Sequence, residues 1–224
     1  MKKITSCLIT LLILITANLE LFAQQGLVPF DKIILTGNIS ALLVEGEHGG
    51  ISIKNNKEDI EYGVEGQTLK IESKNLINYK QIPTIKIIIT YNKLRSIKAR
   101  AGASVFTDNV IEASALNLRF SSGASGELTI DTESLEVGVS EGSHLTLSGT
   151  ADFQEAKSVT GGNLVAYQLD SKEAIVKTNT GGSAKLMVYE RITATAKTGG
   201  NISYKGTPKK EKIKSGLSGS IKAL

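Results

Sequence analysis

Carboxylates recur at a regular spacing in the C-terminal half of the chain. They form three pairs roughly 20 residues apart, namely Asp131 and Glu133, Asp152 and Glu155, and Asp170 and Glu173. Two carboxylates on neighbouring elements can act as acid and base in the cleavage of polysaccharides, and carboxylate clusters can also bind calcium. The alternative is solvated charge on loops that connect repeating elements. The fold that positions these pairs decides between the two.

Aromatic and imidazole side chains are the other candidates for chemistry. Outward aromatic rings can stack on the apolar faces of sugars, and the candidates are Tyr79, Tyr91, Tyr167 and Tyr189. Aromatic residues make up only 5% of the chain and Trp is absent, so packing beneath loops is the alternative. His48 and His144 are far apart in sequence. His144 occupies a position that other repeats fill with Ser or Asn, which predicts a turn-stabilising role.

Lysines crowd the C-terminal end of the chain, with Glu211 as the only acidic neighbour. They are Lys205, Lys209, Lys210, Lys212, Lys214 and Lys222. One interpretation is a contact with an anionic polymer such as lipopolysaccharide or an acidic glycan. The other is a charged terminal coil that blocks end-to-end stacking with another molecule.

A turn centred on glycine recurs seven times from residue 94 onward and organises these candidates. The glycines are Gly102, Gly123, Gly142, Gly161, Gly181, Gly199 and Gly216, with spacings of 21, 19, 19, 20, 18 and 17 residues. A period near 20 is typical of a solenoid. Thr-Gly-Gly also occurs in phosphate-binding loops, but neither a following helix nor a Lys-Ser/Thr pair is present here. We therefore expect β-helix turns.

The residues around each glycine alternate as half-buried strands do. The positions three and five residues before and after the glycine are mostly apolar, as Val137, Leu145 and Leu147 illustrate around Gly142. The positions between them are mostly polar, for example Asn117, Arg119, Glu136, Lys157, Lys177, Thr193 and Thr195. This period of two predicts two short strands per coil, each with one inward face.

Residues 1–23 have the features of a secretory signal peptide. Lys2 and Lys3 form a basic end, an apolar run extends from Cys7 to Ile15, and a cleavage sequence ends at Ala23. We expect the mature chain to begin at Gln24 and to have no transmembrane segment. It would also lack cysteine, since Cys7 is the only one, and a cysteine-free chain has no disulfide, thiol nucleophile or thiolate metal site.

The charge of the mature chain is mildly basic. Without residues 1–23 it has 24 basic and 21 acidic residues, a net charge of +3. A nucleic-acid partner is not indicated, because such proteins cluster Lys and Arg on a strongly basic domain.

Residues 24–93 contain short strand-like segments without the 20-residue period. We interpret them as an irregular antiparallel or mixed β cap over the open end of the solenoid, followed by the β-helix repeats in 94–224. The two parts form one continuous domain. The segment Lys74–Pro83 is expected to be a projecting loop.

Two features together resemble a known bacterial family. The segment from Phe30 has the form Phe-x-x-Ile-x-Leu-x-Gly-x-Ile-x-x-x-Leu-x-Glu-Gly, and the serial Ser/Thr-Gly-Ala/Gly-Ser/Asn turns end in Ser218-Gly219-Ser220-Ile221. The chain thus resembles the auto-transporter adhesin head domain called the GIN domain, common in Bacteroidetes, over roughly residues 26–224. The resemblance implies an all-β fold, a right-handed parallel β-helix of about seven coils of 17–22 residues, and export to the cell envelope. Right-handedness follows independently from parallel crossovers.

The sequence is compatible with three functions. The first is a non-enzymatic binding or adhesion module in the periplasm, on the outer-membrane surface or outside the cell, with glycans or surface polymers as partners. The second is a polysaccharide-active lyase or hydrolase that uses the carboxylate pairs. The third is a structural envelope scaffold. We assign no catalytic, cofactor or metal site, and we expect a monomer or a weak homo-oligomer.

Overall fold

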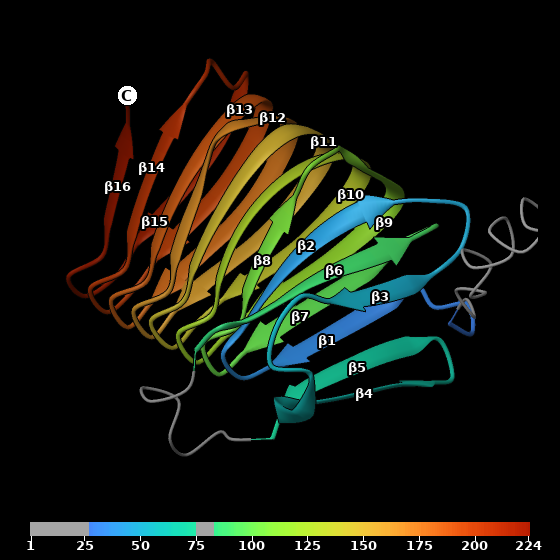
Figure 1. The fold of residues 1–224 in the computed structure, drawn as a ribbon. Coiled ribbons are helices and arrows are strands. Elements are labelled where there is room, and N and C mark those ends of the chain that lie inside the picture. Colours follow the sequence, from blue (N-terminus) through green and yellow to red (C-terminus); the bar gives the residue numbers. More distant parts are fainter. Residues whose placement is uncertain (1–26, 75–82) are drawn as a thin grey trace, which may run out of the picture.

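The computed structural model describes residues 27–74 and 83–224. The predicted signal peptide, Tyr79 and most of the predicted loop Lys74–Pro83 lie outside these ranges. The described chain is a right-handed parallel β-helix, as the sequence predicts, and its described helical content is the 3-10 turn η1 (Lys57–Asp59). Figure 1 shows the coils stacked along one axis, with β16 at one end and β4 at the other.

The regular coils are built from long strands and not from pairs of short ones. Four strands extend over 14 to 17 residues each: β10 (Ser125–Val139), β11 (His144–Val159), β12 (Asn163–Asn179) and β13 (Ser183–Ala196). Each bends midway, and in β10 the two successive residues Glu133 and Ser134 are both exposed at the bend. Parallel pairing with the next coil continues on both sides of the bend, with register shifts between Thr146 and Ser148 of β11 and between Ala166 and Glu173 of β12.

The predicted inward columns are buried in the regular coils. Leu145, Leu147 and Val137 are all at most 1% exposed, and Lys157 and Lys177 point outward. The column three residues after the glycine includes Gly126, because a Cβ there would lie 2.6 Å from the ring of Phe120. The small residue at this position makes room for the large ring of Phe120.

Each regular turn places two residues in the left-handed region. In the turn from Ser140 to Ser143, Glu141 has φ 53° and Gly142 has φ 70°, and the Ser143 N–H donates to the Ser140 carbonyl at 3.1 Å. Positive φ at both central residues defines the type I′ turn. Thr160, Thr180 and Thr198 adopt the first of these positions despite their branched side chains. The sequence indicates only the glycine of each pair.

Hydrogen bonds between successive turns stabilise this backbone. The Gly123 N–H donates to the Glu141 carbonyl at 3.0 Å, and the Gly142 N–H donates to the Thr160 carbonyl at 3.2 Å. The same bond joins three further pairs of adjacent turns. The carbonyls of five left-handed residues are therefore acceptors within the stack, which offsets part of the cost of this conformation: Ser122, Glu141, Thr160, Thr180 and Thr198.

The last coil corrects the sequence alignment by two residues. Gly216 was aligned with the other turn glycines, but Asn201 pairs with Ser220 and Ala194 pairs with Ile213, so Ser218 occupies that column. The final spacing is therefore 19 residues and not 17. Because the slip is an even number, it leaves the inward and outward faces unchanged. Ile213 is nevertheless 42% exposed, since no described coil covers it.

The N-terminal strands continue the parallel stack but not in chain order. They are β1 (Lys32–Thr36), β2 (Ile39–Glu45), β3 (Gly50–Ile53), β4 (Ile60–Glu65), β5 (Thr68–Ser73), β6 (Ile85–Tyr91), β7 (Ser96–Arg100) and β8 (Ser104–Thr107). The coil β1–β2 lies between β5–β6 on one side and β7–β8 on the other, with parallel pairing throughout. Antiparallel β4 and β3 then cover the edges of β5 and β6. The region is mixed, as the sequence predicts.

The coils present two outer faces. The pre-turn face comprises β5, β1, β7, residues 117–120 of β9 (Ile111–Phe120), the C-terminal halves of β10 to β13, and β15 (Lys210–Ser215). The post-turn face comprises β6, β2, β8, the N-terminal halves of β10 to β13, β14 (Asn201–Lys205) and β16 (Ser220–Ala223). Parallel in-register pairing aligns outward side chains in straight rows along both faces.

Candidate functional site

The carboxylate pairs lie near the strand bends, and five of the six carboxylates contact the next coil. The contacts are Thr150 Oγ1 to Asp131 at 2.5 Å, Lys172 Nζ to Asp152 at 2.7 Å, Lys177 Nζ to Glu155 at 3.5 Å, Tyr189 OH to Asp170 at 3.0 Å and Arg191 Nη1 to Glu173 at 3.1 Å. Glu133 is exposed. Among the described residues, no three His, Cys, Asp or Glu side chains gather closely enough to hold a metal ion. The carboxylates link coils in this structure.

One of these ion pairs changes the basicity of its lysine. The hydrogen bond from Lys172 to Asp152, together with the attraction between their charges, raises the pKa of the Lys172 amine. Both side chains are more than half exposed, so the pair contributes little to stability.

The tyrosine candidates do not form one stacking platform. The prediction that Tyr91 points outward is wrong, because its side chain is only 3% exposed and burial, with the nearby charge of Glu45, raises its pKa to about 12. Tyr167 is half-buried; its hydroxyl lies 2.7 Å from Ser203 Oγ, and Lys205 Nζ lies 4.8 Å from its ring centre. Tyr189 is 43% exposed.

His144 belongs to a row of small polar side chains on the post-turn face. Its Nδ1 lies 3.0 Å from Asn163 Nδ2 in the next coil, and its Nε2 lies 3.3 Å from Thr146 Oγ1. One coil earlier, the hydroxyls of Ser104 and Ser125 are 2.8 Å apart. In register, the row is Ser104, Ser125, His144, Asn163, Ser183, Asn201 and Ser220.

The terminal lysines follow the C-terminal strands. Lys205 ends β14, three lysines alternate along β15, and Lys222 lies on β16. All are exposed. Both proposed roles for this end, polymer contact and protection of a strand edge, remain predictions.

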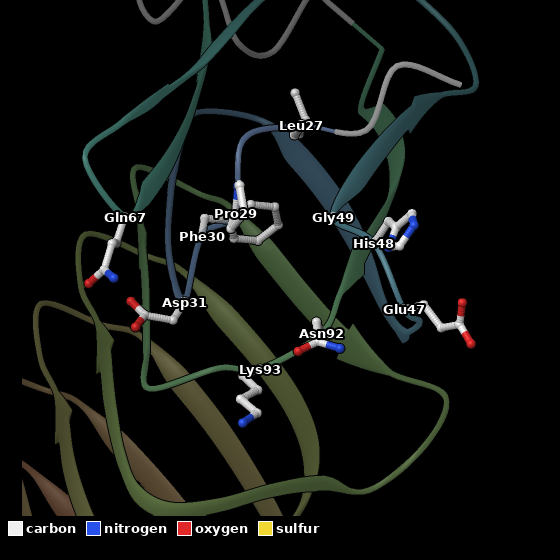
Figure 2. Close-up of a pocket in the computed structure, with 10 residues that line it drawn as sticks. All are labelled: Leu27, Pro29, Phe30, Asp31, Glu47, His48, Gly49, Gln67, Asn92 and Lys93. Carbon is white, nitrogen blue, oxygen red and sulfur yellow. The ribbon is translucent and has the colours of Figure 1, made fainter. Parts of the chain in front are cut away.

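A pocket of about 560 Å³ lies where the N-terminal segment crosses the first coils. Its lining is Leu27, Pro29, Phe30, Asp31, Glu47, His48, Gly49, Gln67, Asn92 and Lys93. Figure 2 shows Asp31 and Gln67 on one side, Glu47 and His48 on the other, and Lys93 below. Phe30 is 7% exposed, and its ring packs so closely on Gly49 that a Cβ there would lie 2.8 Å from it.

Asp31 is the polar anchor of this pocket. Its Oδ2 accepts a hydrogen bond from Arg95 Nε at 2.6 Å, whereas its Oδ1 is buried without a hydrogen-bond partner. Arg95 also donates to Gln67 Oε1 at 3.1 Å. The two pocket carboxylates, Asp31 and Glu47, lie on opposite sides in Figure 2. They do not form a close carboxylate pair.

A row of cations along the pre-turn face was not identified from the sequence. We define the axial basic row as the nine positions in register Lys70, Ile34, Lys98, Arg119, Gly138, Lys157, Lys177, Thr195 and Lys214. Six of these positions are cationic and none is acidic. From Lys98 onward, each lies four residues before the central column of its turn, so the sequence contains the signal as a further column in the stacked repeats.

A shallow groove of about 970 Å³ overlies the N-terminal part of this row. Its lining includes the four cations Lys32, Arg95, Lys98 and Arg119 and one carboxylate, Glu136. Glu136 forms an ion pair with Arg119. The groove is therefore a polar, net positive surface and not an enclosed catalytic cavity.

Within residues 27–74 and 83–224, we find no helix whose length and apolar character would let it cross a membrane.

Comparison with known proteins agrees with this architecture. The family model described as "Putative auto-transporter adhesin, head GIN domain" matches residues 29–208. A structure described as a "putative adhesin" from Bacteroides fragilis is 22% identical, with a TM-score of 0.78, and covers 89% of this chain and 94% of its own. A "putative adhesin" from Parabacteroides distasonis is 17% identical, with a TM-score of 0.70 and the same coverage.

A third similar structure has a different description. It is a "Putative lipid binding protein", also from Parabacteroides distasonis, which is 17% identical, has a TM-score of 0.64, and covers 88% of this chain and 94% of its own. At these identities the likeness concerns the fold alone. No curated protein matches the chain.

Proposed function

Because the chain belongs to the family of the auto-transporter adhesin head GIN domain, we propose that it is an exported, non-enzymatic binding module that holds extended surface polymers such as glycans. Export is part of the proposal and rests on the signal-like residues 1–23. The periplasm, the outer-membrane surface and the cell exterior are all compatible with it.

The straight rows of outward side chains are the observation that carries the proposal. The post-turn row from Ser104 to Ser220 offers hydroxyl, amide and imidazole groups, and one such group stands on each successive strand. Neighbouring strands lie about 4.8 Å apart, so the row repeats on the scale of a sugar unit. A linear polymer can contact several such groups at once, and weak contacts then add up to useful avidity.

A polysaccharide-cleaving enzyme is the alternative. The contacts of the carboxylates count against it, because Asp131, Asp152 and Asp170 each bind a neighbouring coil through a hydrogen bond or an ion pair. A general acid and its partner must instead reach opposite sides of one glycosidic bond. An enzyme would have to break these contacts to free its carboxylates, whereas a binding module can keep them.

The test is incubation of the mature chain with a panel of host and bacterial polysaccharides, both neutral and acidic. Bound fraction is measured by co-sedimentation and polymer length by size-exclusion chromatography. We expect at least one polymer to bind at unchanged length. Shortened chains would overturn the proposal in favour of the enzyme, and binding to no polymer would leave a scaffold as the better account.

A further inference from the structure

The axial basic row concentrates positive charge that the fold does not use. Its side chains alternate with the buried residues Ile97, Leu118 and Val137 and their equivalents, so they stand on the solvent side of well-ordered strands. Lys98, Lys157 and Lys214 are exposed, and they have no ion-pair partner among the described residues. These three lysines contribute nothing to the core.

The remaining cations of the row are only partly neutralised. Lys70 pairs with Glu65, Arg119 with Glu136, and Lys177 with Glu155. Every one of these carboxylates lies beside the row and not in it, because Glu136 and Glu155 occupy the adjacent outward row and Glu65 lies on β4. Exposed pairs of this kind are weak and exchange readily with other anions.

The row is straight and long. It crosses nine parallel strands, and a strand spacing of about 4.8 Å gives it a length of roughly 38 Å. Lys32, Arg95, Lys98 and Arg119 surround the groove at its N-terminal part, and Asn117 and Ser96 add neutral hydrogen-bonding groups to the groove wall. This geometry fits a linear polyanion lying parallel to the solenoid axis.

The neighbouring side chains favour an acidic polysaccharide over a nucleic acid. Single-stranded nucleic acids are held by aromatic platforms on which the bases stack. The axial basic row and the two outward rows that flank it, which begin in β5 at Thr68 and Glu72, contain no aromatic residue among their described positions. They contain Ser, Thr and Asn, which can hydrogen-bond sugar hydroxyls.

We propose that the axial basic row and its groove bind an acidic polysaccharide laid along the solenoid axis, and polygalacturonate is the probe for this class. The inference rests on the proposed polymer-binding function and assigns acidic polymers to the pre-turn face, whereas the post-turn row offers hydroxyl, amide and imidazole groups to other glycans. Each cation makes a weak, solvent-screened contact, so affinity depends on the number of cations engaged and falls with salt.

The experiment compares two charge-reversal pairs on opposite faces. The double variant Lys98→Glu, Lys157→Glu alters the row, and the double variant Lys86→Glu, Lys185→Glu makes the same change in net charge on the post-turn face. Binding to polygalacturonate, neutral dextran and single-stranded DNA is measured by affinity electrophoresis at low and high salt. Thermal melting checks that every variant folds.

We expect the unaltered protein to bind polygalacturonate with an affinity that falls as salt rises. The row variant should bind about tenfold more weakly, and the control variant should stay within about twofold. Equal losses in both variants would overturn the inference, as would tighter binding to DNA than to polygalacturonate. Binding to dextran or another neutral glycan, without binding to polygalacturonate, would overturn the inference and leave the proposed function standing. Binding to no polymer in this experiment or in the polysaccharide panel would overturn both.

Discussion

The regular coils and the N-terminal coils reach the same parallel stack by different means. In the regular coils, one bent strand per coil and a two-residue left-handed turn repeat with little variation from β10 to β13. In the N-terminal coils, short strands rich in isoleucine pair in parallel, but the chain visits them out of spatial order. Both regions pair in parallel around an inward apolar column. Stacking of the coils therefore depends on the inward column. The repeat period in the sequence reflects only the order in which the chain connects one coil to the next.

The largest expected effect comes from breaking the inward column in a regular coil. Leu147 is fully buried, so Leu147→Asp loses roughly 2 kcal/mol of apolar burial and places a charge in the interior. We expect loss of the cooperative thermal transition measured by circular dichroism. Lys177→Asp, on the outer face of the neighbouring coil, should melt close to the unaltered protein. Equal losses from both substitutions would mean that the inward and outward columns are misassigned.

A smaller effect should separate the turns of the regular coils from the N-terminal strands. A Cβ on Gly142 meets no atom within 4 Å, but its φ is 70°, so Gly142→Ala costs about 1–2 kcal/mol through the backbone alone. Gly63 on β4 also has open space but no positive φ, and Gly63→Ala should change the free energy of unfolding by less than about 1 kcal/mol. Urea denaturation measures both. If the two variants were equally stable, the left-handed turn would not be the constraint we describe.

The last effect concerns a buried hydroxyl of the N-terminal coils, and it is absent at neutral pH and appears only under alkaline conditions. Because the pKa of Tyr91 rises to about 12 on folding from an ordinary value of 10, the folded state disfavours the tyrosinate. The associated stability is fully present below pH 10 and is lost as pH rises through 12, by about 2–3 kcal/mol. In Tyr91→Phe, this loss of stability between pH 10 and pH 12 should be absent. Urea midpoints that fall in parallel for both proteins across this range would contradict the assignment.

The sequence predicts the regular coils well, because their signals are local. A glycine every 17 to 21 residues and a period of two identify the turns and the inward residues, including Leu145 and Val137. The two-residue slip at Ser218 shows the weakness of such an alignment, since Gly216 supplies a glycine but not the left-handed conformation. The insertion of β1–β2 between β5–β6 and β7–β8 depends on pairing between strands that are far apart in the sequence. A local sequence pattern does not indicate such pairing.

The candidate sites were less predictable, because outward positions face no packing constraint. Tyr91 is a candidate for an exposed aromatic by residue type alone, and yet its side chain is buried. The carboxylates near the bends contact residues one coil away, as Asp170 contacts Tyr189, and such contacts depend on the register between coils. The axial basic row becomes visible when the register of nine strands is known. Its N-terminal members Lys70 and Ile34 fall outside the 20-residue period, so the stacked repeats could not have included them.

If the chain is exported as we propose, the spatial order of the first coils has a consequence for its folding. A chain that crosses a membrane from its N-terminus presents β1–β2 first, but both sides of that coil are covered only after β5–β6 and then β7–β8 have arrived. The earliest coil to emerge would therefore wait with two open edges, and open edges invite pairing with other chains. Once β1–β2 has gained a neighbour on each side, the later coils can add at a single growing front. The first coil in the sequence is thus an inner coil of the stack, with β5–β6 on one side and every later coil on the other.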